Sequence, residues 1–387
     1  MNKKLSYLKH ALALILMVTL SIPVFAQAKV AEAGIAGIMK ELDAAGVSVA
    51  VVKDNKIIYT HSFGYKDIES NTTLTDRDIF RIASISKSFS ATSIMQLVEA
   101  GKVSLDDDFS KLIGFKVRNP NFPNTVITLK MVMSHTSSLN DSQGYFSLDG
   151  INPDKNPNAS KCYNSYEPGK GFQYCNLNYN MVGTVIEKLS GERFDQYVKH
   201  HILDPLGLYG GYCVDSLDKT RFATLYEYDA KTRKLTADPG AYNPRSEEIK
   251  KYVMGYSTPI FSPTGGMKIS ATDLAKYMMM HMNYGKANGV RIIKRKHSKL
   301  MQTKVSDNDG GYGLALRGSA DLIPGEKMMG HTGSAYGLYS AMFFEPKKKF
   351  GFVVITNGCN PAFLPGSEDI VLLSRKVINC LYDNFIR

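Results

Sequence analysis

The segments with strand-like composition lie at the two ends of this 387-residue chain, and a long region of different character separates them. Residues 47–52 and 56–62 are rich in β-branched and aromatic residues, and the Asp54-Asn55 turn between them predicts a hairpin at the edge of a sheet. Up to four more strands are predicted near the C-terminus, at residues 311–316, 328–331, 338–344 and 350–356. We therefore expect strands from both ends to form one discontinuous sheet domain.

Helices are predicted at residues 34–45, from Ser84 to a stop at Gly101, and at 369–384. The region between the strand groups is rich in Asn, Pro, Gly, Tyr and Ser and has short helical stretches such as 180–189. We interpret it as a mainly helical inserted lobe. The expected domains are a sheet domain at residues 30–104 plus 256–387 and a helical lobe at 105–255. The expected fold class is α/β, of the α+β type.

The first 26 residues have the layout of a secretory signal peptide. Three lysines precede an uncharged run at residues 11–22, and the small residues Ala26 and Ala28 follow. A membrane-anchoring helix, the alternative, needs about 20 apolar residues, and this run is shorter. No cysteine precedes Cys162, so a lipoprotein anchor is not predicted. We expect a periplasmic or secreted protein with no stable membrane span in the mature chain.

The formal net charge is +11, and it falls to +8 (11 − 3) when the three leader lysines are removed. A basic surface favours anionic substrates or an anionic envelope. The basic residues are nevertheless scattered, and their longest run is residues 347–349 in a predicted turn. The sequence has no nucleic-acid-binding motif, phosphate-binding glycine loop or repeat, so nucleic acid is not an expected partner.

The chain has five cysteines, at positions 162, 175, 213, 359 and 380. Their spacing fits no zinc site, and no metal is expected. An oxidising compartment would permit disulfides between Cys162 and Cys175 and between Cys359 and Cys380, which would leave Cys213 unpaired. The alternative is that most of the five are free, buried thiols.

The first segment with recognisable chemistry is Ser84-x-x-Lys87, at a predicted helix start. Three residues make about one helical turn, so the Ser84 hydroxyl and the Lys87 amine are expected on the same face. A desolvated lysine can lose its charge and accept the proton of a serine nucleophile. Free N–H groups at the helix start can also hold a developing oxyanion. Alone, the motif is weak, because exposed helical Ser and Lys residues reach this spacing by chance.

Two further segments carry complementary groups. In the helical lobe, Tyr174 can act as a general base near a cation, and the Asn176 amide can bind a substrate carbonyl and orient a lysine. On a predicted edge strand, residues 331–334 read His-Thr-Gly-Ser. There, Thr332 can bind a substrate carboxylate, Gly333 lets the substrate backbone approach, and the N–H of Ser334 can complete an oxyanion hole with that of Ser84. A purely structural role is the alternative for Tyr174 and for His331.

The three motifs, in this order and with these gaps, resemble those of the class C β-lactamase and serine D,D-carboxypeptidase family, the penicillin-recognising serine hydrolases that include related esterases. Residues 133–139, 263–267 and 311–314 are similar to further stretches of that family. The resemblance extends over about residues 47–358. It implies a two-lobed fold with an antiparallel sheet, helices on both sheet faces and a site between the lobes.

The resemblance also implies a mechanism in which Ser84 attacks a carbonyl and forms an acyl-enzyme. In that mechanism Lys87 and Tyr174 move protons, Asn176 and residues 331–334 bind substrate, and no cofactor is needed. His331 stands where most true β-lactamases of this class carry lysine, which favours the peptidases and esterases of the family. Ser138 replaces a usual glycine, and Cys175 lies inside the Tyr-x-Asn motif.

The sequence predicts an exported serine hydrolase acting on a small molecule or peptide that carries a carboxylate. The substrate stays open among a D-alanyl peptide, a β-lactam and a small ester. One alternative is an acyltransferase that passes the acyl group to an alcohol or amine. Another is a penicillin-binding sensor module without turnover, which would be expected to lose Lys87, Tyr174 or Gly333, and the chain retains all three.

Overall fold

The computed structural model describes residues 27–306, 311–367 and 369–387. The predicted signal peptide at residues 1–26 lies outside these residues. The first described element is a helix at residues 27–41. A search of the described ranges for a helix with the length and apolar character of a bilayer span found none.

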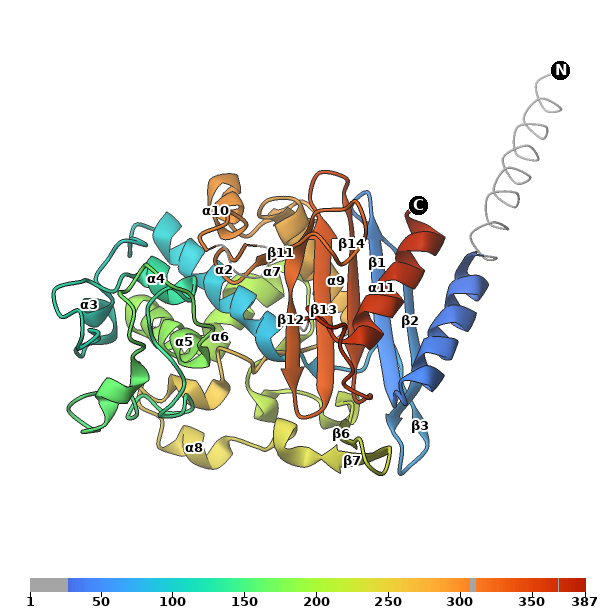
Figure 1. The fold of residues 1–387 in the computed structure, drawn as a ribbon, viewed down its shortest axis with the longest axis horizontal. Helices are drawn as coiled ribbons and strands as arrows, with labels where there is room; N and C mark the ends of the chain where they lie inside the picture. The colour runs from blue at the N-terminus through green and yellow to red at the C-terminus, as the bar shows by residue number, and fades with distance from the viewer. Residues whose placement is uncertain (1–26, 307–310, 368) are drawn as a thin grey trace, which may run out of the picture.

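One seven-stranded antiparallel sheet organises the described residues, with the strand order β11-β12-β13-β14-β1-β2-β3 (Figure 1). The strands are β1 (Gly46–Lys53), β2 (Lys56–Asp67), β3 (Thr72–Thr73), β11 (Arg317–Ser319), β12 (Met328–Ala335), β13 (Leu338–Glu345) and β14 (Phe350–Thr356). β14 pairs with β1 from Val47 to Lys53, so strands from the two chain ends meet in the middle of the sheet. The predicted fold class, with its antiparallel sheet, is confirmed.

Some predicted boundaries are wrong for local reasons. Residues 311–316 do not form a regular strand, because Ala315 has a φ of +62° and Gly313 lies against the carbonyl oxygen of Met301; the strand begins at Arg317. The N-terminal hairpin is not the sheet edge, since β3 pairs outside β2. Gly34 lies inside the first helix, where a Cβ would stand 2.8 Å from the Cys380 sulfur.

Helices cover both faces of the sheet. The helix at residues 27–41 and the C-terminal helix α11 (Leu372–Phe385) contact each other and pack on one face, and α9 (Ala271–Met282) packs on the other (Figure 1). In β1, Val47, Val49 and Val51 contribute to the core under α11, while Ala50 and Val52 contribute to the opposite core. This alternation follows from the two-residue period of a strand whose two faces are both buried.

The other half of the molecule is mainly helical and rich in loops (Figure 1). Its helices are α2 (Ser86–Glu99), α3 (Phe109–Ile113), α4 (Leu129–Met133), α5 (Asn176–Ser190), α6 (Phe194–Val198), α7 (Asp204–Leu206), α8 (Ser246–Lys250) and α10 (Arg295–Met301). The described residues also form three smaller sheets. One has three strands, in the order β4 (Phe80–Arg81), β8 (Lys268–Ile269), β5 (Gly210–Gly211). The others pair β6 (Leu225–Asp229) with β7 (Lys234–Asp238) and β9 (Lys286–Ala287) with β10 (Val290–Arg291). The division into domains at residues 104/105 and 255/256 stays a prediction.

The two disulfides considered from the sequence are not formed, and all five cysteines are free thiols. The Cys175 thiol donates a hydrogen bond to a carboxylate oxygen of Asp141 at 3.2 Å, whereas that of Cys162 donates to the carbonyl oxygen of Gly150 at 3.5 Å. Each sulfur therefore has its own polar partner, and the alternative of free thiols, four of them buried, describes the structure.

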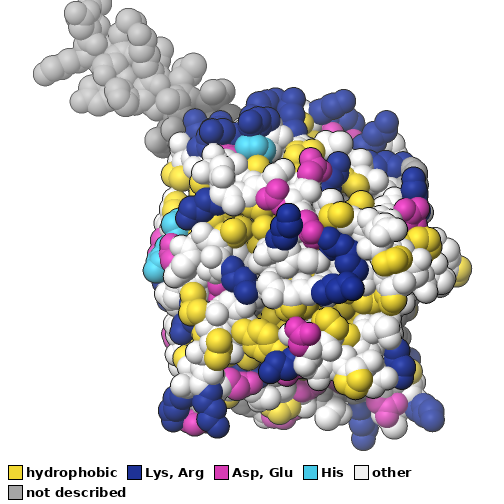
Figure 2. All heavy atoms as spheres, turned by 90° about the vertical axis from the view of Figure 1, so that its left-hand side faces the viewer, with side chains coloured by type: hydrophobic (Ala, Val, Ile, Leu, Met, Phe, Trp, Pro, Cys, Tyr) yellow, Lys and Arg dark blue, Asp and Glu magenta, His cyan; other side chains and the backbone are white. Residues whose placement is uncertain are grey.

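The basic residues are dispersed on the face of the molecule formed by its helical end. Figure 2 shows Lys and Arg side chains at several separate places on this face, with acidic and hydrophobic side chains between them. This arrangement agrees with scattered solvated lysines, and it gives no single basic block on the face shown.

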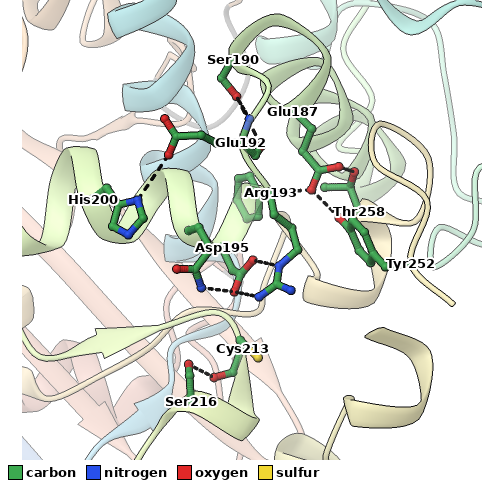
Figure 3. A network of polar contacts seen from close by, with 12 residues as sticks. Glu187, Ser190, Glu192, Arg193, Asp195, His200, Cys213, Ser216, Tyr252 and Thr258 are labelled. Carbon is green, nitrogen blue, oxygen red and sulfur yellow. Dashed lines mark hydrogen bonds and ion pairs between the residues drawn. The ribbon is translucent and has the colours of Figure 1, made fainter. Parts of the chain in front are cut away.

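A buried carboxylate holds the helical half together. Glu187, near the end of α5, is 1% exposed and accepts hydrogen bonds from the N–H groups of Phe194 and Gly255 at 2.8 Å, and from the Thr258 hydroxyl at 2.9 Å. The Tyr252 hydroxyl donates to it as well (Figure 3). Because Thr258 opens the 3₁₀ turn η7 (Thr258–Phe261), this carboxylate fixes the chain that leads to Thr264 beside Lys87.

We expect Glu187→Ala to lower the free energy of unfolding by about 3 kcal/mol or more, because two buried N–H groups would lose a charged acceptor. Equilibrium unfolding in urea measures this loss. Glu192→Ala is the matched control, since Glu192 contacts His200 and His201 at the surface, and such exposed pairs contribute about 0–1 kcal/mol (Figure 3). Equal losses for the two variants would contradict the role assigned to Glu187.

Candidate active site

The structure places Ser84 in a short 3₁₀ turn, η1 (Ala83–Ile85), directly before α2. Ala83 has a φ of +47°, an unfavourable left-handed conformation for a residue with a side chain. Such conformations persist where the surroundings enforce them, and they concentrate at functional sites. The turn presents the Ser84 hydroxyl to a cavity and leaves the Ser84 N–H in the first turn, where it has no helical acceptor.

Lys87 lies one turn later, and its amine is completely buried. The Nζ atom donates to Ser84 Oγ at 3.0 Å, to Asn176 Oδ1 at 2.9 Å and to the carbonyl oxygen of Thr264 at 3.1 Å. Among the described residues, no carboxylate lies within ion-pair distance of this amine. The serine and the lysine are therefore joined directly, as the three-residue spacing predicts.

Burial lowers the pKa of Lys87 from 10.5 to about 7, although the nearby charge of Asp141 acts in the opposite direction. The cause is that desolvation disfavours the charged ammonium. A sizeable fraction of Lys87 is therefore neutral at pH 7 and able to accept the proton of Ser84.

Tyr174 lies next to this pair. The Lys87 Nζ atom is 4.7 Å from the centre of the Tyr174 ring. The Tyr174 hydroxyl is buried and has no hydrogen-bond partner in the described part of the chain. Burial raises the pKa of Tyr174, and an interaction with the Ser84 side chain opposes that shift. In the free enzyme Tyr174 is thus a neutral phenol, suited to donating a proton, and it is not a standing phenolate base.

The edge of β12 forms the opposite wall. Ala335 faces Leu338 across a two-residue turn in which Tyr336 and Gly337 have φ values of +55° and +75°, as in a type I′ hairpin. Hydrogen-bonded pairs alternate along an antiparallel ladder, so the backbone N–H groups of Thr332 and Ser334 point away from β13. Within the described ranges, β11 pairs with β12 only at residues 328–330. The backbone edge at Thr332 and Ser334 is therefore open to a ligand.

Gly333 brings this strand against the serine turn. A Cβ atom at this position would lie 2.3 Å from the carbonyl oxygen of Ile82, 2.5 Å from Ser340 Oγ and 3.1 Å from the Ala83 Cβ. The Ser340 hydroxyl also donates to the carbonyl oxygen of Ile82 at 2.9 Å. Any side chain at Gly333 would push β12 away from Ser84, which explains the need for glycine here.

His331 is buried beside Tyr312, whose hydroxyl lies 3.3 Å from the His331 Nε2 atom. Burial lowers the pKa of His331 to about 3, and the nearby charge of Lys87 contributes. His331 is therefore a neutral imidazole near pH 7, and it cannot supply the positive charge of a lysine at this position.

Ser138 and Cys175, the two departures from the family's motifs, have defined contacts in the structure. Ser138 has a φ of +63°, the conformation that glycine favours, and its hydroxyl oxygen accepts a hydrogen bond from Asn119 Nδ2 at 2.9 Å. Cys175 precedes α5 and has no disulfide, so the segment that carries Tyr174 is braced by hydrogen bonds instead.

A cavity of about 600 Å³ joins these elements. Its lining includes the predicted residues Ser84, Tyr174, Asn176, His331, Thr332, Gly333 and Ser334. Lys87 does not line the cavity, but its amine contacts the lining residues Ser84 and Asn176. The structure thus brings every predicted site residue to one place, and their catalytic roles stay predictions.

Sequence reasoning assigned no role to several residues at the site. Arg317 and Tyr312 line the cavity, Thr264 contributes the carbonyl that holds Lys87, and Asp141 binds Asn176. Thr264 and Tyr312 lie in the family-like stretches at residues 263–267 and 311–314, and this similarity could have indicated that they belong to the site. Within the described residues, no group of three or more His, Cys, Asp or Glu side chains is arranged to hold a metal ion. The absence of a metal or cofactor from the reaction stays a prediction.

The comparisons with known proteins agree with this geometry. The family model described as Beta-lactamase matches residues 31–373. Protein flp of Staphylococcus aureus is 24% identical over 328 residues, which are 83% of this chain but only 60% of that relative's length.

Solved structures give the same fold. The octameric penicillin-binding protein homologue from Pyrococcus abyssi is 27% identical, with a TM-score of 0.71 over 91% of this chain and 76% of that chain. EstCE1, described as a hydrolase with promiscuous acyltransferase activity, is 20% identical, with a TM-score of 0.73 over 93% of this chain and 100% of that chain. Because the family model matches residues 31–373, the chain belongs to the Beta-lactamase family, and it is homologous to the hydrolases of that type.

Proposed function

We propose that this protein is a serine hydrolase that forms an acyl-enzyme on Ser84 with a small amide or ester. The observation that carries the proposal is the direct 3.0 Å contact between the Ser84 hydroxyl and a completely buried amine. A serine becomes a useful nucleophile when an adjacent base takes its proton, and burial gives Lys87 a pKa of about 7, suited to that task.

In the acylation step, Ser84 Oγ attacks the substrate carbonyl carbon while its proton passes to neutral Lys87. The tetrahedral oxyanion is stabilised by the N–H groups of Ser84 and Ser334, which line the same cavity. When the bond to the leaving group breaks, its nitrogen or oxygen must receive a proton. We assign the donation of that proton to the buried Tyr174 hydroxyl, and its reprotonation to Lys87, whose amine lies 4.7 Å from the centre of the Tyr174 ring.

Hydrolysis requires a second attack. Water adds to the ester carbonyl of the acyl-enzyme, gives one proton to the same Lys87 and Tyr174 pair, and expels Ser84 Oγ, which takes a proton back. The products are the free acid and the regenerated serine. Asn176 contacts both Lys87 and Thr264, so it keeps the amine in place through both steps.

The cavity favours a substrate with a carboxylate. Arg317 faces Gly330 in the ladder, so its side chain lies on the same face as that of Thr332 two residues on. The Arg317 guanidinium forms an ion pair with Asp369. A substrate carboxylate would bind the same guanidinium. Because His331 is neutral, we favour a D-alanyl peptide or a small ester over efficient β-lactam hydrolysis.

Acyl transfer is a second candidate. An acyl-enzyme that admits an alcohol or amine in place of water becomes a transferase. The similarity to EstCE1 in fold, together with a cavity large enough for a second molecule, supports acyl transfer to an organic acceptor.

Export through a leader at residues 1–26 also belongs to the proposal and rests on the sequence pattern alone. The mass of the protein recovered from the periplasm or medium would show whether the mature chain begins near Gln27.

We expect a fluorophosphonate to label the wild-type protein and to leave Ser84→Ala unlabelled, as measured by intact-protein mass spectrometry. The rate of labelling should rise with pH to a plateau, with its inflection near pH 7, because only neutral Lys87 accepts the serine proton. Below the inflection, the rate should fall about tenfold for each pH unit.

Penicillin is the second probe in the same experiment. A Ser84-dependent adduct with a long lifetime would support a peptidase-like enzyme, and rapid loss of the adduct would indicate a true β-lactamase. Labelling by the fluorophosphonate alone would favour an esterase or acyltransferase. Labelling of Ser84→Ala, or no labelling of the wild type, would overturn the proposed nucleophile.

A carboxylate on the substrate is expected to raise kcat/KM by roughly 10- to 100-fold over the amide-capped analogue, the range of one or two charge-assisted hydrogen bonds. Thr332→Val should reduce this preference, and Thr332→Ser, which keeps the hydroxyl, should retain it. Equal turnover of the acid and its amide by the wild type would rule out a carboxylate site.

A further inference from the structure

The helix that carries Asn176 has no capping side chain of its own. α5 begins after Cys175, whose side chain makes no capping hydrogen bond. Asp141, 35 residues before Asn176, takes that role from another loop. Its carboxylate accepts the N–H of Asn176 at 2.9 Å through one oxygen and the N–H of Leu177 at 2.9 Å through the other. The start of α5 is therefore held by a residue distant in sequence.

The same carboxylate also determines how the Asn176 side chain is turned. Asn176 Nδ2 donates to Asp141 at 3.0 Å, which directs Oδ1 to the Lys87 amine at 2.9 Å and to the Thr264 hydroxyl at 3.0 Å. If the amide were rotated by 180°, its NH₂ group would face the Lys87 amine and its oxygen would face a carboxylate. The contact between the amide oxygen and the carboxylate would be repulsive, and so would that between the NH₂ group and the ammonium form of Lys87, so Asp141 favours the observed orientation.

We propose that Asp141 is a positioning residue of the active site, which orients the Asn176 amide toward Lys87 and through it sets the acid–base behaviour of the lysine. This inference rests on the proposed acylation of Ser84. The contacts that carry it are the four hydrogen bonds to the Asp141 carboxylate, from the two backbone N–H groups, Asn176 Nδ2 and the Cys175 thiol.

The other titratable groups around Lys87 are neutral near pH 7, so the charge of Asp141 has a distinct effect on the pKa of Lys87. The aromatic rings of Tyr174 and Tyr179 lie 4.7 Å and 5.9 Å from the amine. Burial lowers the pKa values of His135 and His331, so both are neutral near pH 7. The Cys175 thiol is neutral too, because burial raises its pKa. Among these neighbours, Asp141 is the group whose negative charge opposes the desolvation of the Lys87 ammonium.

If Asp141 only stabilised the start of α5, its loss would have a different effect from the one proposed here. Loss of a cap lowers the free energy of unfolding but does not change the pKa of a lysine on another helix. Loss of a carboxylate that also sets the charge of Lys87 must displace the pH profile of acylation. The pH profile of labelling therefore distinguishes the two roles.

The test measures fluorophosphonate labelling of the full-length mature protein as a function of pH. For Asp141→Asn, we expect the inflection to move to lower pH by about 0.5–1 unit, less than the shift caused by a directly contacting charge. We also expect the plateau rate to fall about tenfold, because Asn176 is no longer held in one orientation. Asp108→Asn is the matched control: Asp108 also caps a helix, but its carboxylate contacts Ser110 and Arg118, neither of which lines the cavity. Its labelling profile should equal that of the wild type.

Asp141→Glu keeps the charge but lengthens the side chain by one methylene. Its inflection should stay at the wild-type pH while its plateau rate falls, and this variant also serves if Asp141→Asn does not fold. The proposal is overturned if Asp141→Asn keeps the wild-type inflection, or if Asp141→Glu is the sole folded variant and labels as the wild type does. Failure of the wild type itself to label at Ser84 would instead reject the proposed function, so the two failures are distinguishable.

Discussion

The candidate active site depends on a buried amine that has no contacting carboxylate among the described residues. Lys87 is excluded from water, and its Nζ atom is bound by a hydroxyl, an amide oxygen and a backbone carbonyl. Removing an ammonium from water without a counter-ion is costly, so such a lysine gives up its proton near neutral pH. The surrounding structure has to keep the three oxygen partners in place, and much of the fold serves this requirement.

Each partner of Lys87 comes from a different part of the chain. Ser84 stands on a turn in which the strained Ala83 is held against β12 at Gly333. Asn176 begins α5, where Asp141 caps the helix and orients its amide. Thr264 follows η7, which Glu187 ties to the end of α5. The sheet edge, the helix start and the loop that supply these partners are therefore each held by contacts of their own.

Much of the fold followed from periodicity and composition. β14 has the predicted bounds, the predicted Asp54-Asn55 turn joins β1 and β2, and the strands from the two chain ends pair. The failures lie where local sequence is ambiguous. The sequence predicts a helix start at Gly34, but this glycine lies inside the helix, close to Cys380. Residues 311–316 have the composition of a strand, although Ala315 turns the chain. The sequence does not distinguish a glycine that ends a helix or strand from one that allows close packing of a neighbouring residue.

The sequence by itself determined that Ser84 and Lys87 lie about one helical turn apart, and the three motifs together, rather than this spacing alone, indicated the family. It also determined the succession of strand-rich and loop-rich regions. Only the tertiary structure decided the charge of Lys87 and the neutrality of His331 and Tyr174, since those follow from burial by distant segments. It alone revealed Asp141, since no local pattern links residue 141 to a helix that begins 35 residues later, and a hydrogen bond across that separation exists only once the loops have packed.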